Sequence, residues 1–119
     1  MDSSSVNVTV GTNAAFPDLT IIGVKGTIDA VTSKKVDEKV LPIIEKKESN
    51  IILDLSEIDY LSSTGMMCLI KYLVFLTDRK KLFKVVKPPK HVYDTLQIAG
   101  IAKHFDIYDS VDAALNTFK

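Results

Sequence analysis

The segment that most limits how this chain can fold is a short, almost continuously apolar run near its middle. Residues 50–56 contain Ile51, Ile52, Leu53 and Leu55. A strand with one face in water alternates apolar and polar side chains, whereas a strand covered on both faces is apolar nearly throughout. The run therefore predicts a strand that lies inside a sheet and is covered on both faces.

Other segments have the composition of further strands. Residues 6–10 alternate valine with polar side chains, and residues 19–25 form an apolar, β-branched run. The stretch 11–18 between them contains the Gly, Asn, Pro and Asp residues that favour turns, so these two strands are predicted to be antiparallel. Another strand is expected at 82–86, and a short one at 105–108.

Four segments show the periodicity of helices. The first has an apolar stripe of Val36, Val40, Ile43 and Ile44 with Thr32 or Ser33 as its cap, and Pro42 inside it predicts either a kink or an early end. The others extend from the hydroxyl-rich residues 62–65 to Arg79, from Val92 to Ala99 before Gly100, and over 111–118 after a cap at Asp109 or Ser110.

The order of these elements, two strands followed by alternating helices and strands, predicts an α/β fold with right-handed crossovers. The chain has 119 residues, the length of a single domain, and it can bury roughly two thirds of its unfolded surface. We expect a mixed β-sheet of about four to five strands with about four helices. Residues 6–119 would form the domain, and the polar residues 1–5 a flexible N-terminus.

The composition excludes several classes of protein. Hydrophobic residues make up 46% of the chain and charged residues 25%, which is not the composition of a disordered or fibrous protein. Fifteen basic residues balance fifteen acidic ones, so no net field attracts nucleic acid or an anionic membrane. One basic cluster lacks interleaved aromatic residues and is interpreted as a solvated edge: Arg79, Lys80, Lys81, Lys84, Lys87 and Lys90.

The single cysteine and the amino-terminal residues indicate the compartment. Cys68 has no second cysteine with which to form an internal disulfide, and residues 1–10 lack the features of a signal peptide. The longest apolar stretch, 66–76, is interrupted by Lys71 and is shorter than the roughly 20 residues of a membrane-spanning helix. A cytoplasmic protein without membrane insertion is predicted.

The hydroxyl-rich start of the second predicted helix carries the most chemical information. Ser62, Ser63 and Thr64 precede Gly65 and an apolar helix. The amides at a helix start carry partial positive charge and can hold phosphate oxygens. The spacing alone favours a capping role for Ser63 and Thr64, and acceptance of a phosphate by the same hydroxyls is the alternative.

Several short segments occur with this one in a definite order. They are Gly26-Thr27-Ile28-Asp29, Asp54-Leu55-Ser56, Tyr60-Leu61-Ser62-Ser63-Thr64-Gly65, Val85-Val86-Lys87-Pro88, Val92 to Gly100, and Phe105-Asp106-Ile107-Tyr108. Together they resemble the STAS domain of bacterial anti-sigma factor antagonists over nearly the whole chain. That family has an apolar strand, a short loop and an Asp-Ser-Ser-Gly segment that opens an apolar helix. The resemblance therefore implies a single STAS-like domain.

Alignment on Gly65 places Thr64 on the family's phosphorylated serine, Ser63 on the serine before it, and Ser62 on the preceding aspartate. Two departures from the family pattern therefore coincide. Threonine adds a methyl group that a serine-directed kinase has to accommodate. The loss of the aspartate removes a negative charge from the loop.

The resemblance implies a partner switch without catalysis by this chain. The unmodified domain would bind an anti-sigma factor that is also a serine/threonine kinase, and so free the sigma factor. Phosphorylation at Thr64 or Ser63 would abolish that binding, and a protein phosphatase would restore it. The residues implied in partner binding are Asp29, Ser62, Ser63, Thr64, Gly65 and Met66.

Other interpretations of these residues stay open. Asp29 follows a strand, so a turn role competes with a place beside the phosphorylation loop. Met66, Met67 and Cys68 have the character of core residues, although the first turn of their helix can expose a methionine to a partner. Within the same fold, the alternative function is a STAS scaffold or an accessory subunit of a stress-signalling assembly or a lipid transporter.

An enzyme is the remaining class of function. It would use Ser63 as nucleophile and His91 or His104 as base, but the Gly-x-Ser-x-Gly elbow is missing. The histidines, Cys68 and the carboxylates lack the close paired spacings of zinc sites. No metal and no cofactor are predicted.

Overall fold

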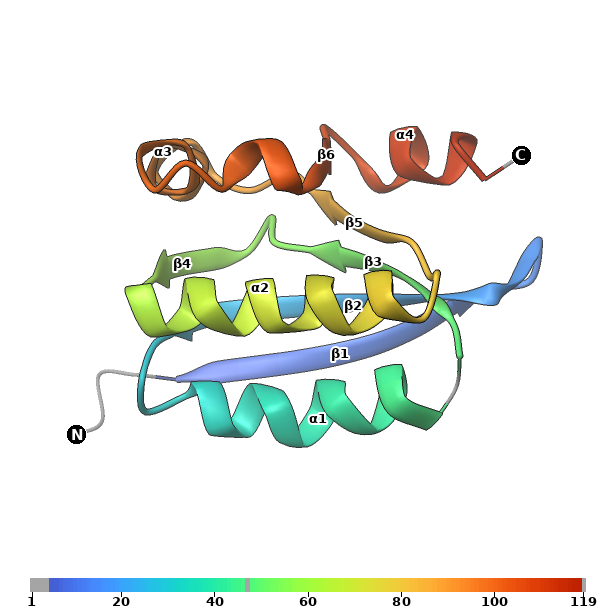
Figure 1. The fold of residues 1–119 in the computed structure, drawn as a ribbon, viewed down its shortest axis with the longest axis horizontal. Helices are drawn as coiled ribbons and strands as arrows, with labels where there is room; N and C mark the ends of the chain where they lie inside the picture. Colours follow the sequence, from blue (N-terminus) through green and yellow to red (C-terminus); the bar gives the residue numbers. More distant parts are fainter. Residues whose placement is uncertain (1–4, 47, 119) are drawn as a thin grey trace.

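The computed structural model describes residues 5–46 and 48–118, so residues 1–4 of the predicted flexible segment lie outside the described part. Ser5 is described, and its carbonyl accepts a hydrogen bond from the Thr27 amide at 2.9 Å. The elements (Figure 1) are β1 (Val6–Asn13), β2 (Phe16–Ile28), α1 (Ser33–Lys46), β3 (Asn50–Asp54), β4 (Ile58–Leu61), α2 (Ser63–Asp78), β5 (Phe83–Val86), α3 (Lys90–Ile98), a 3₁₀ turn (Ala102–His104), β6 (Asp106–Tyr108) and α4 (Val111–Asn116).

The sheet is mixed, as predicted. Its strand order is β1-β2-β3-β5-β6, with β1 antiparallel to β2 and the other neighbours in this order parallel. The apolar strand β3 lies between β2 and β5, and Ile51, Ile52 and Leu53 are each at most 1% exposed. The predictions of an internal strand at 50–55 and of an antiparallel first pair are confirmed, and the described residues form four helices.

The resemblance implies a short loop between the apolar strand and the hydroxyl-rich segment, and this expectation is wrong for most of residues 57–61. Residues 58–61 form β4, which pairs in parallel with the last three residues of β2 and brings the described sheet to six strands. The burial of β4 runs buried, exposed, exposed, buried, from Ile58 to Leu61. A strand of four residues whose burial does not alternate gives no period-2 signal in the sequence. Its pairing depends on how far β2 extends beyond β3, which is a property of the whole sheet.

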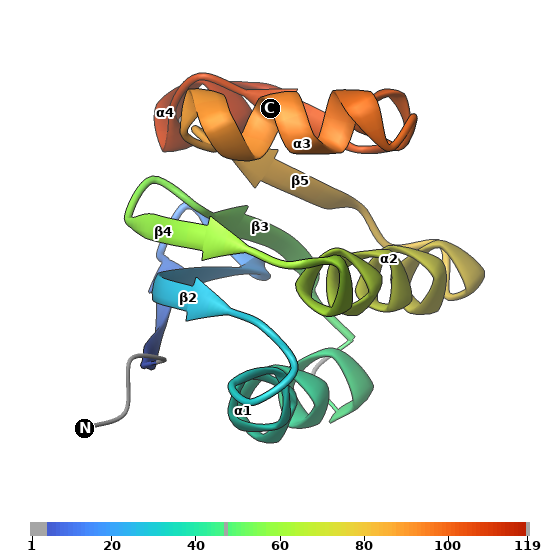
Figure 2. The ribbon, with the colours of Figure 1, turned by 90° about the vertical axis from the view of Figure 1, so that its left-hand side faces the viewer.

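Apolar side chains cover the two faces of the sheet unequally. The larger core lies between the sheet and α1, α2 and α3, and it contains Val36, Val40, Leu69, Tyr72 and Leu96. α1 and α2 run side by side in both views (Figures 1 and 2). A smaller cluster on the opposite face joins Ala114 of α4 to Leu19, Ile52 and Val86.

The structure bears on two local expectations. α1 does not end at Pro42 but continues to Lys46, because its buried stripe of Val36, Val40 and Ile44 is held against the sheet. Lys84 was expected on a solvated edge, and it is instead only 6% exposed. Burial acts to lower the pKa of Lys84, but hydrogen bonds to Asp106 and Tyr108 outweigh it and raise the pKa, so the buried amine stays charged.

A polar cluster links α1 to α2. The Asp37 carboxylate accepts hydrogen bonds from the Lys71 ammonium at 2.7 Å, from the Tyr72 hydroxyl and from the Cys68 thiol at 3.4 Å. Burial acts to raise the pKa of Asp37, but these three donors together hold it below its usual value. Burial also raises the pKa values of Cys68 and Tyr72, so both stay neutral and the thiol is a structural group. Within the described residues, no helix is long and apolar enough to cross a membrane.

The depressed pKa of Asp37 predicts a pH-dependent contribution to stability. A carboxyl group whose pKa is lower in the folded state stabilises the fold above its unfolded pKa, and this contribution is lost as the pH falls through the folded value. We expect Asp37→Asn to lower the free energy of unfolding at neutral pH by about 1–2 kcal/mol. The difference from the wild type should shrink as the pH falls below about 4. Urea unfolding across that range measures it, and a difference that is constant with pH would contradict the prediction.

Candidate functional site

The candidate site lies where two parallel strands end side by side. β2 and β4 are in register at their last residues, with Thr27 opposite Tyr60 and Ile28 opposite Leu61. Each strand then turns into a helix, β2 into α1 and β4 into α2, at the end that faces the viewer in Figure 2. The amino termini of two helices therefore meet at one end of the sheet, where their dipoles favour negative charge.

Asp29 forms the turn between β2 and α1. Its carboxylate accepts hydrogen bonds from the amides of Val31 and Thr32, both at 2.9 Å. In return, the Asp29 amide donates to the hydroxyl of Thr32, which is fully buried and donates to the carbonyl of Thr27. Asp29 thus has the turn role that its sequence position indicated, and it also immediately follows Ile28, which contacts the start of α2.

Ser62, and not Ser63 or Thr64, caps α2. The Ser62 hydroxyl oxygen accepts a hydrogen bond from the Gly65 amide at 3.1 Å, and its backbone is extended, as expected for an N-cap. Ser63 and Thr64 are the first two residues of the helix, and both are exposed. The capping interpretation of Ser63 and Thr64 is therefore wrong, and their hydroxyls are open to solvent.

Gly65 allows α2 to lie directly against the end of β2. A Cβ atom added there would meet the Ile28 carbonyl oxygen at 2.5 Å and the Leu61 side chain at 2.7 Å. The same Ile28 oxygen accepts a hydrogen bond from the Ser62 amide at 3.0 Å. One carbonyl thus holds the start of α2 through a hydrogen bond and through a close contact that only glycine permits.

Exposed apolar side chains lie on the segments around the two hydroxyls. Val31 in the Asp29 turn is 61% exposed, Tyr60 at the end of β4 is 56% exposed, and Met67 in α2 is 69% exposed. Met66, which was predicted to contact a partner, is partly buried against the core. Sequence reasoning did not select Val31 or Tyr60. The available signal for Met67 was its place off the buried stripe of α2, which contains Cys68, Leu69, Tyr72 and Leu76.

The histidines are placed elsewhere. Nε2 of His91 lies 2.7 Å from the carbonyl oxygen of Asp59 and links α3 to β4. His104 lines a groove beside Thr77, about 20 Å along α2 from Ser63. The described residues contain no cluster of His, Cys, Asp and Glu side chains that could hold a metal ion. This arrangement does not favour the use of either histidine as a base for Ser63.

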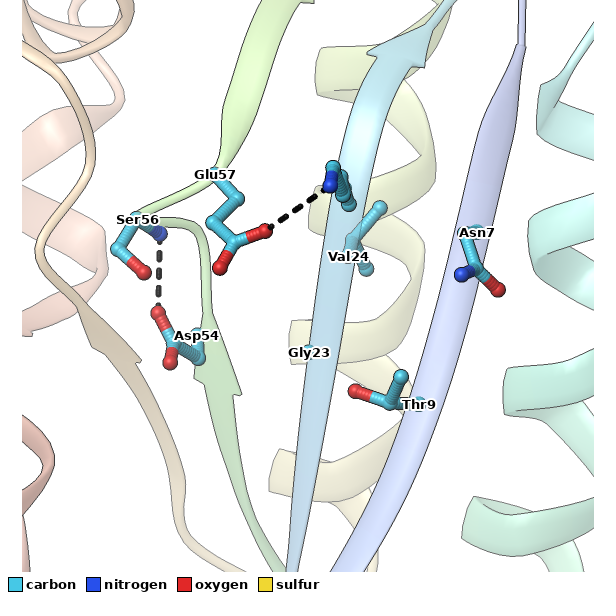
Figure 3. A pocket seen from close by; sticks show the side chains of 8 residues that line it. Asn7, Thr9, Gly23, Val24, Asp54, Ser56 and Glu57 are labelled. Atoms are coloured by element: carbon cyan, nitrogen blue, oxygen red, sulfur yellow. Dashed lines mark hydrogen bonds and ion pairs between the residues drawn. The ribbon is translucent and has the colours of Figure 1, made fainter.

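A second hollow, of about 150 Å³, opens on the sheet face opposite α1 and α2 (Figure 3). Gly23 forms its floor between Thr9 and Asp54. The Asp54 carboxylate accepts the Ser56 amide at 2.9 Å, and Lys25 lies 3.8 Å from the largely exposed carboxylate of Glu57. Asp54 and Lys25 thus each have a partner within the hollow itself.

Comparison with known proteins identifies the class of protein that has this fold and site. The family model of the STAS domain matches residues 11–114. The match covers both strand ends, the Asp29 turn, the hydroxyls and the helices around them. The chain therefore belongs to the STAS domain family.

The individual relatives have low sequence identity to this chain. A Bordetella bronchiseptica protein described as a candidate anti-sigma factor antagonist, BtrV, is 23% identical over 95 residues, which are 80% of this chain and 82% of that protein. The crystal structure of an anti-sigma factor antagonist from Mycobacterium paratuberculosis superimposes with a TM-score of 0.84 at 23% identity, covering 95% of this chain and 93% of that one.

A third relative has been solved in two states. The anti-sigma factor antagonist SpoIIAA in its unphosphorylated form has a TM-score of 0.74 at 13% identity, covering 93% of this chain and 96% of that one. The Bacillus cell fate determinant SpoIIAA in its phosphorylated form has a TM-score of 0.72 at 12% identity, covering 95% and 100%. At these identities the structural comparisons establish the fold.

The close contact at Gly65 predicts that this glycine cannot be replaced at low cost. We expect Gly65→Ala to lower the free energy of unfolding by about 1–3 kcal/mol, because the added methyl group collides with a backbone carbonyl that cannot rotate away. Gly11→Ala is the matched control, since the nearest atom to its Cβ is 4.0 Å away. Urea unfolding of both variants measures the effect, and equal stabilities would show that the start of α2 moves freely.

Proposed function

We propose that this chain is an anti-sigma factor antagonist that works by a phosphorylation-controlled partner switch. The unmodified protein binds an anti-sigma factor that is also a serine/threonine kinase, and the bound sigma factor is released. Phosphorylation of Thr64, or of Ser63, abolishes this binding, and a protein phosphatase restores it. The names of the relatives support the general role, and the geometry of the site supports the switch.

The observation that carries the proposal is the exposure of two adjacent hydroxyls at the start of α2. Ser63 and Thr64 are in the first turn, whereas the hydroxyl of Ser62 is occupied by the Gly65 amide. A kinase can therefore approach Ser63 and Thr64 without opening the fold. Of the two, the alignment on Gly65 favours Thr64.

A phosphate at this position is compatible with the folded domain. It adds about −1.5 to −2 charge at a helix amino terminus, where the helix dipole favours an anion. The same charge opposes burial of Val31, Tyr60 and Met67 against a partner, because the phosphate would lose water on binding. The modification would thus change the interface and leave the fold intact. The similarity of this chain to both forms of SpoIIAA, with TM-scores of 0.74 and 0.72, agrees with a switch that does not refold the domain.

The first test uses three substitutions of Thr64 and the anti-sigma factor recovered with the wild-type protein from native cytosol. Thr64→Glu should weaken binding by about tenfold or more, since an unpaired charge in the contact costs more than about 1.4 kcal/mol. Thr64→Gln is the matched neutral control and should bind within about threefold of the wild type. Thr64→Ala should bind as the wild type does and keep binding in the presence of ATP.

Calorimetry measures the affinities after circular dichroism has shown that each variant is folded. If Thr64→Glu and Thr64→Gln bind equally, charge at this position is not the switch. If the recovered partner is a scaffold or a transporter and no anti-sigma factor is present, the proposed class of partner is wrong.

The second test maps the phosphate. Incubation with the cognate kinase and ATP should place one phosphate on Thr64, or on Ser63, and none on Ser62, whose hydroxyl caps the helix. Peptide mass spectrometry of the wild type, Thr64→Ala and Ser63→Ala identifies the acceptor. Phosphate found only outside residues 62–64 would remove the switch from this loop.

A further inference from the structure

A second surface suited to binding lies along the free side of β1. In the described part of the chain, β1 borders the sheet and pairs only with β2. It is eight residues long, from Val6 to Asn13, and contains neither a charged residue nor a proline. Long uncharged edge strands readily accept another strand, and natural proteins usually protect them with charge, proline or a covering element.

The register of β1 shows which of its backbone groups are available. The Thr27 amide donates to the Ser5 carbonyl, so this pair is hydrogen-bonded, and hydrogen-bonded pairs alternate along an antiparallel ladder. The next pair, Val6 and Gly26, is therefore a non-bonded pair. The amides and carbonyls that point away from β2 accordingly belong to Val6, Val8, Val10 and Thr12.

A row of lysines on α1 flanks this edge. α1 packs against the sheet through Val36, Val40 and Ile44, and its Asp37 side faces α2 through the ion pair with Lys71. At 100° per residue, the opposite side of α1 carries Lys35, Lys39 and Lys46, all of which are exposed. α1 also contacts β1. The acidic residues of α1, which are Asp37, Glu38 and Glu45, fall on the side toward α2 or toward solvent.

We propose that the β1 edge, defined as the outward side of Val6–Asn13 together with Lys35, Lys39 and Lys46, binds an extended acidic segment of a partner protein by strand addition. The segment would pair with the free backbone groups of β1 and direct alternate carboxylates toward the lysines. Val10, which is 47% exposed, lies on the same face of β1 as Val6 and Val8, so the methylene groups of the lysine-facing side chains would cover it. This surface is separate from the hydroxyls of α2.

A second copy of this chain fits the edge less well. Antiparallel pairing of β1 with itself would put both α1 helices on the same face of the joined sheet, with their lysine rows toward each other. Because β1 contains no acidic residue, the added strand would offer these lysines no partner. Charge complementarity therefore selects a different, acidic chain.

The experiment uses the full-length protein and three synthetic peptides. The probe is acetyl-Thr-Glu-Thr-Glu-Thr-Glu-Thr-amide, one control has lysine in place of glutamate, and the other has the same composition with its glutamates contiguous. We expect only the alternating glutamate peptide to bind at millimolar concentration and to shift the amide resonances of Val6, Val8 and Val10. Equal binding of the two glutamate peptides, or no binding of the probe, would overturn the proposal.

Variants test the charge and the backbone separately. Lys39→Glu should weaken probe binding about fivefold at low salt, whereas Lys34→Glu, the same change on the α2 side of α1, should weaken it less than about twofold. Val8→Pro removes an outward amide that β2 does not use, and it should abolish binding while the protein stays folded. If Val8→Pro unfolds, Lys39→Glu and Lys34→Glu still test the proposal. Equal effects of these two variants on probe binding would overturn it.

Two further readouts complete the test. Thr64→Glu should leave probe binding unchanged, so failure of this proposal is distinguishable from failure of the partner switch. Sedimentation should show no dimer at the concentrations used. A dimer that excludes the probe would assign the β1 edge to self-association and overturn the acidic-segment proposal.

Discussion

The carbonyl group of Ile28 is the point on which the arrangement of this domain depends. It accepts the amide of Ser62, and the Cα of Gly65 lies so close to it that a side chain would collide. Through this contact, the last residue of β2 determines where α2 begins. Since β2 also pairs with β1, β3 and β4, the start of α2 is positioned relative to most of the sheet. A surface loop at the same sequence position would have no such constraint.

The rigidity of this junction suits a site controlled by modification. The Asp29 turn is held by hydrogen bonds that involve the buried Thr32, and α1 and α2 are held together by Asp37, Lys71 and Tyr72. Ser63 and Thr64 stand exposed on this framework. A phosphate there would change the charge of the surface while the surrounding backbone keeps its hydrogen bonds. The two proposed surfaces, at the start of α2 and along β1, share no residue.

Much of the architecture could be predicted because it follows from local patterns in the sequence. The continuous apolar run at 50–56 predicted the internal strand, and the spacing of apolar residues predicted all four helices. The prediction failed where local pattern and tertiary environment disagree. β4 does not alternate, and it exists because β2 extends beyond β3. Pro42 does not end α1, since packing of its buried stripe outweighs one lost hydrogen bond. Lys84 is buried because Asp106 and Tyr108 from the neighbouring strand bond to it.

Some features of the candidate site follow from the sequence, and others follow only from the tertiary structure. The sequence by itself determined the chemistry of the loop, because three consecutive hydroxyls, a glycine and an apolar helix are local features, and it determined the STAS-like character through the order of its short motifs. Only the tertiary structure decided which hydroxyl caps α2, which hydroxyls face solvent, and that Val31, Tyr60 and Met67 accompany them. The position of the lysine row beside β1 is likewise decided by the tertiary structure. These properties depend on how segments far apart in the sequence pack together, and burial and hydrogen bonding between such segments are set by the whole fold.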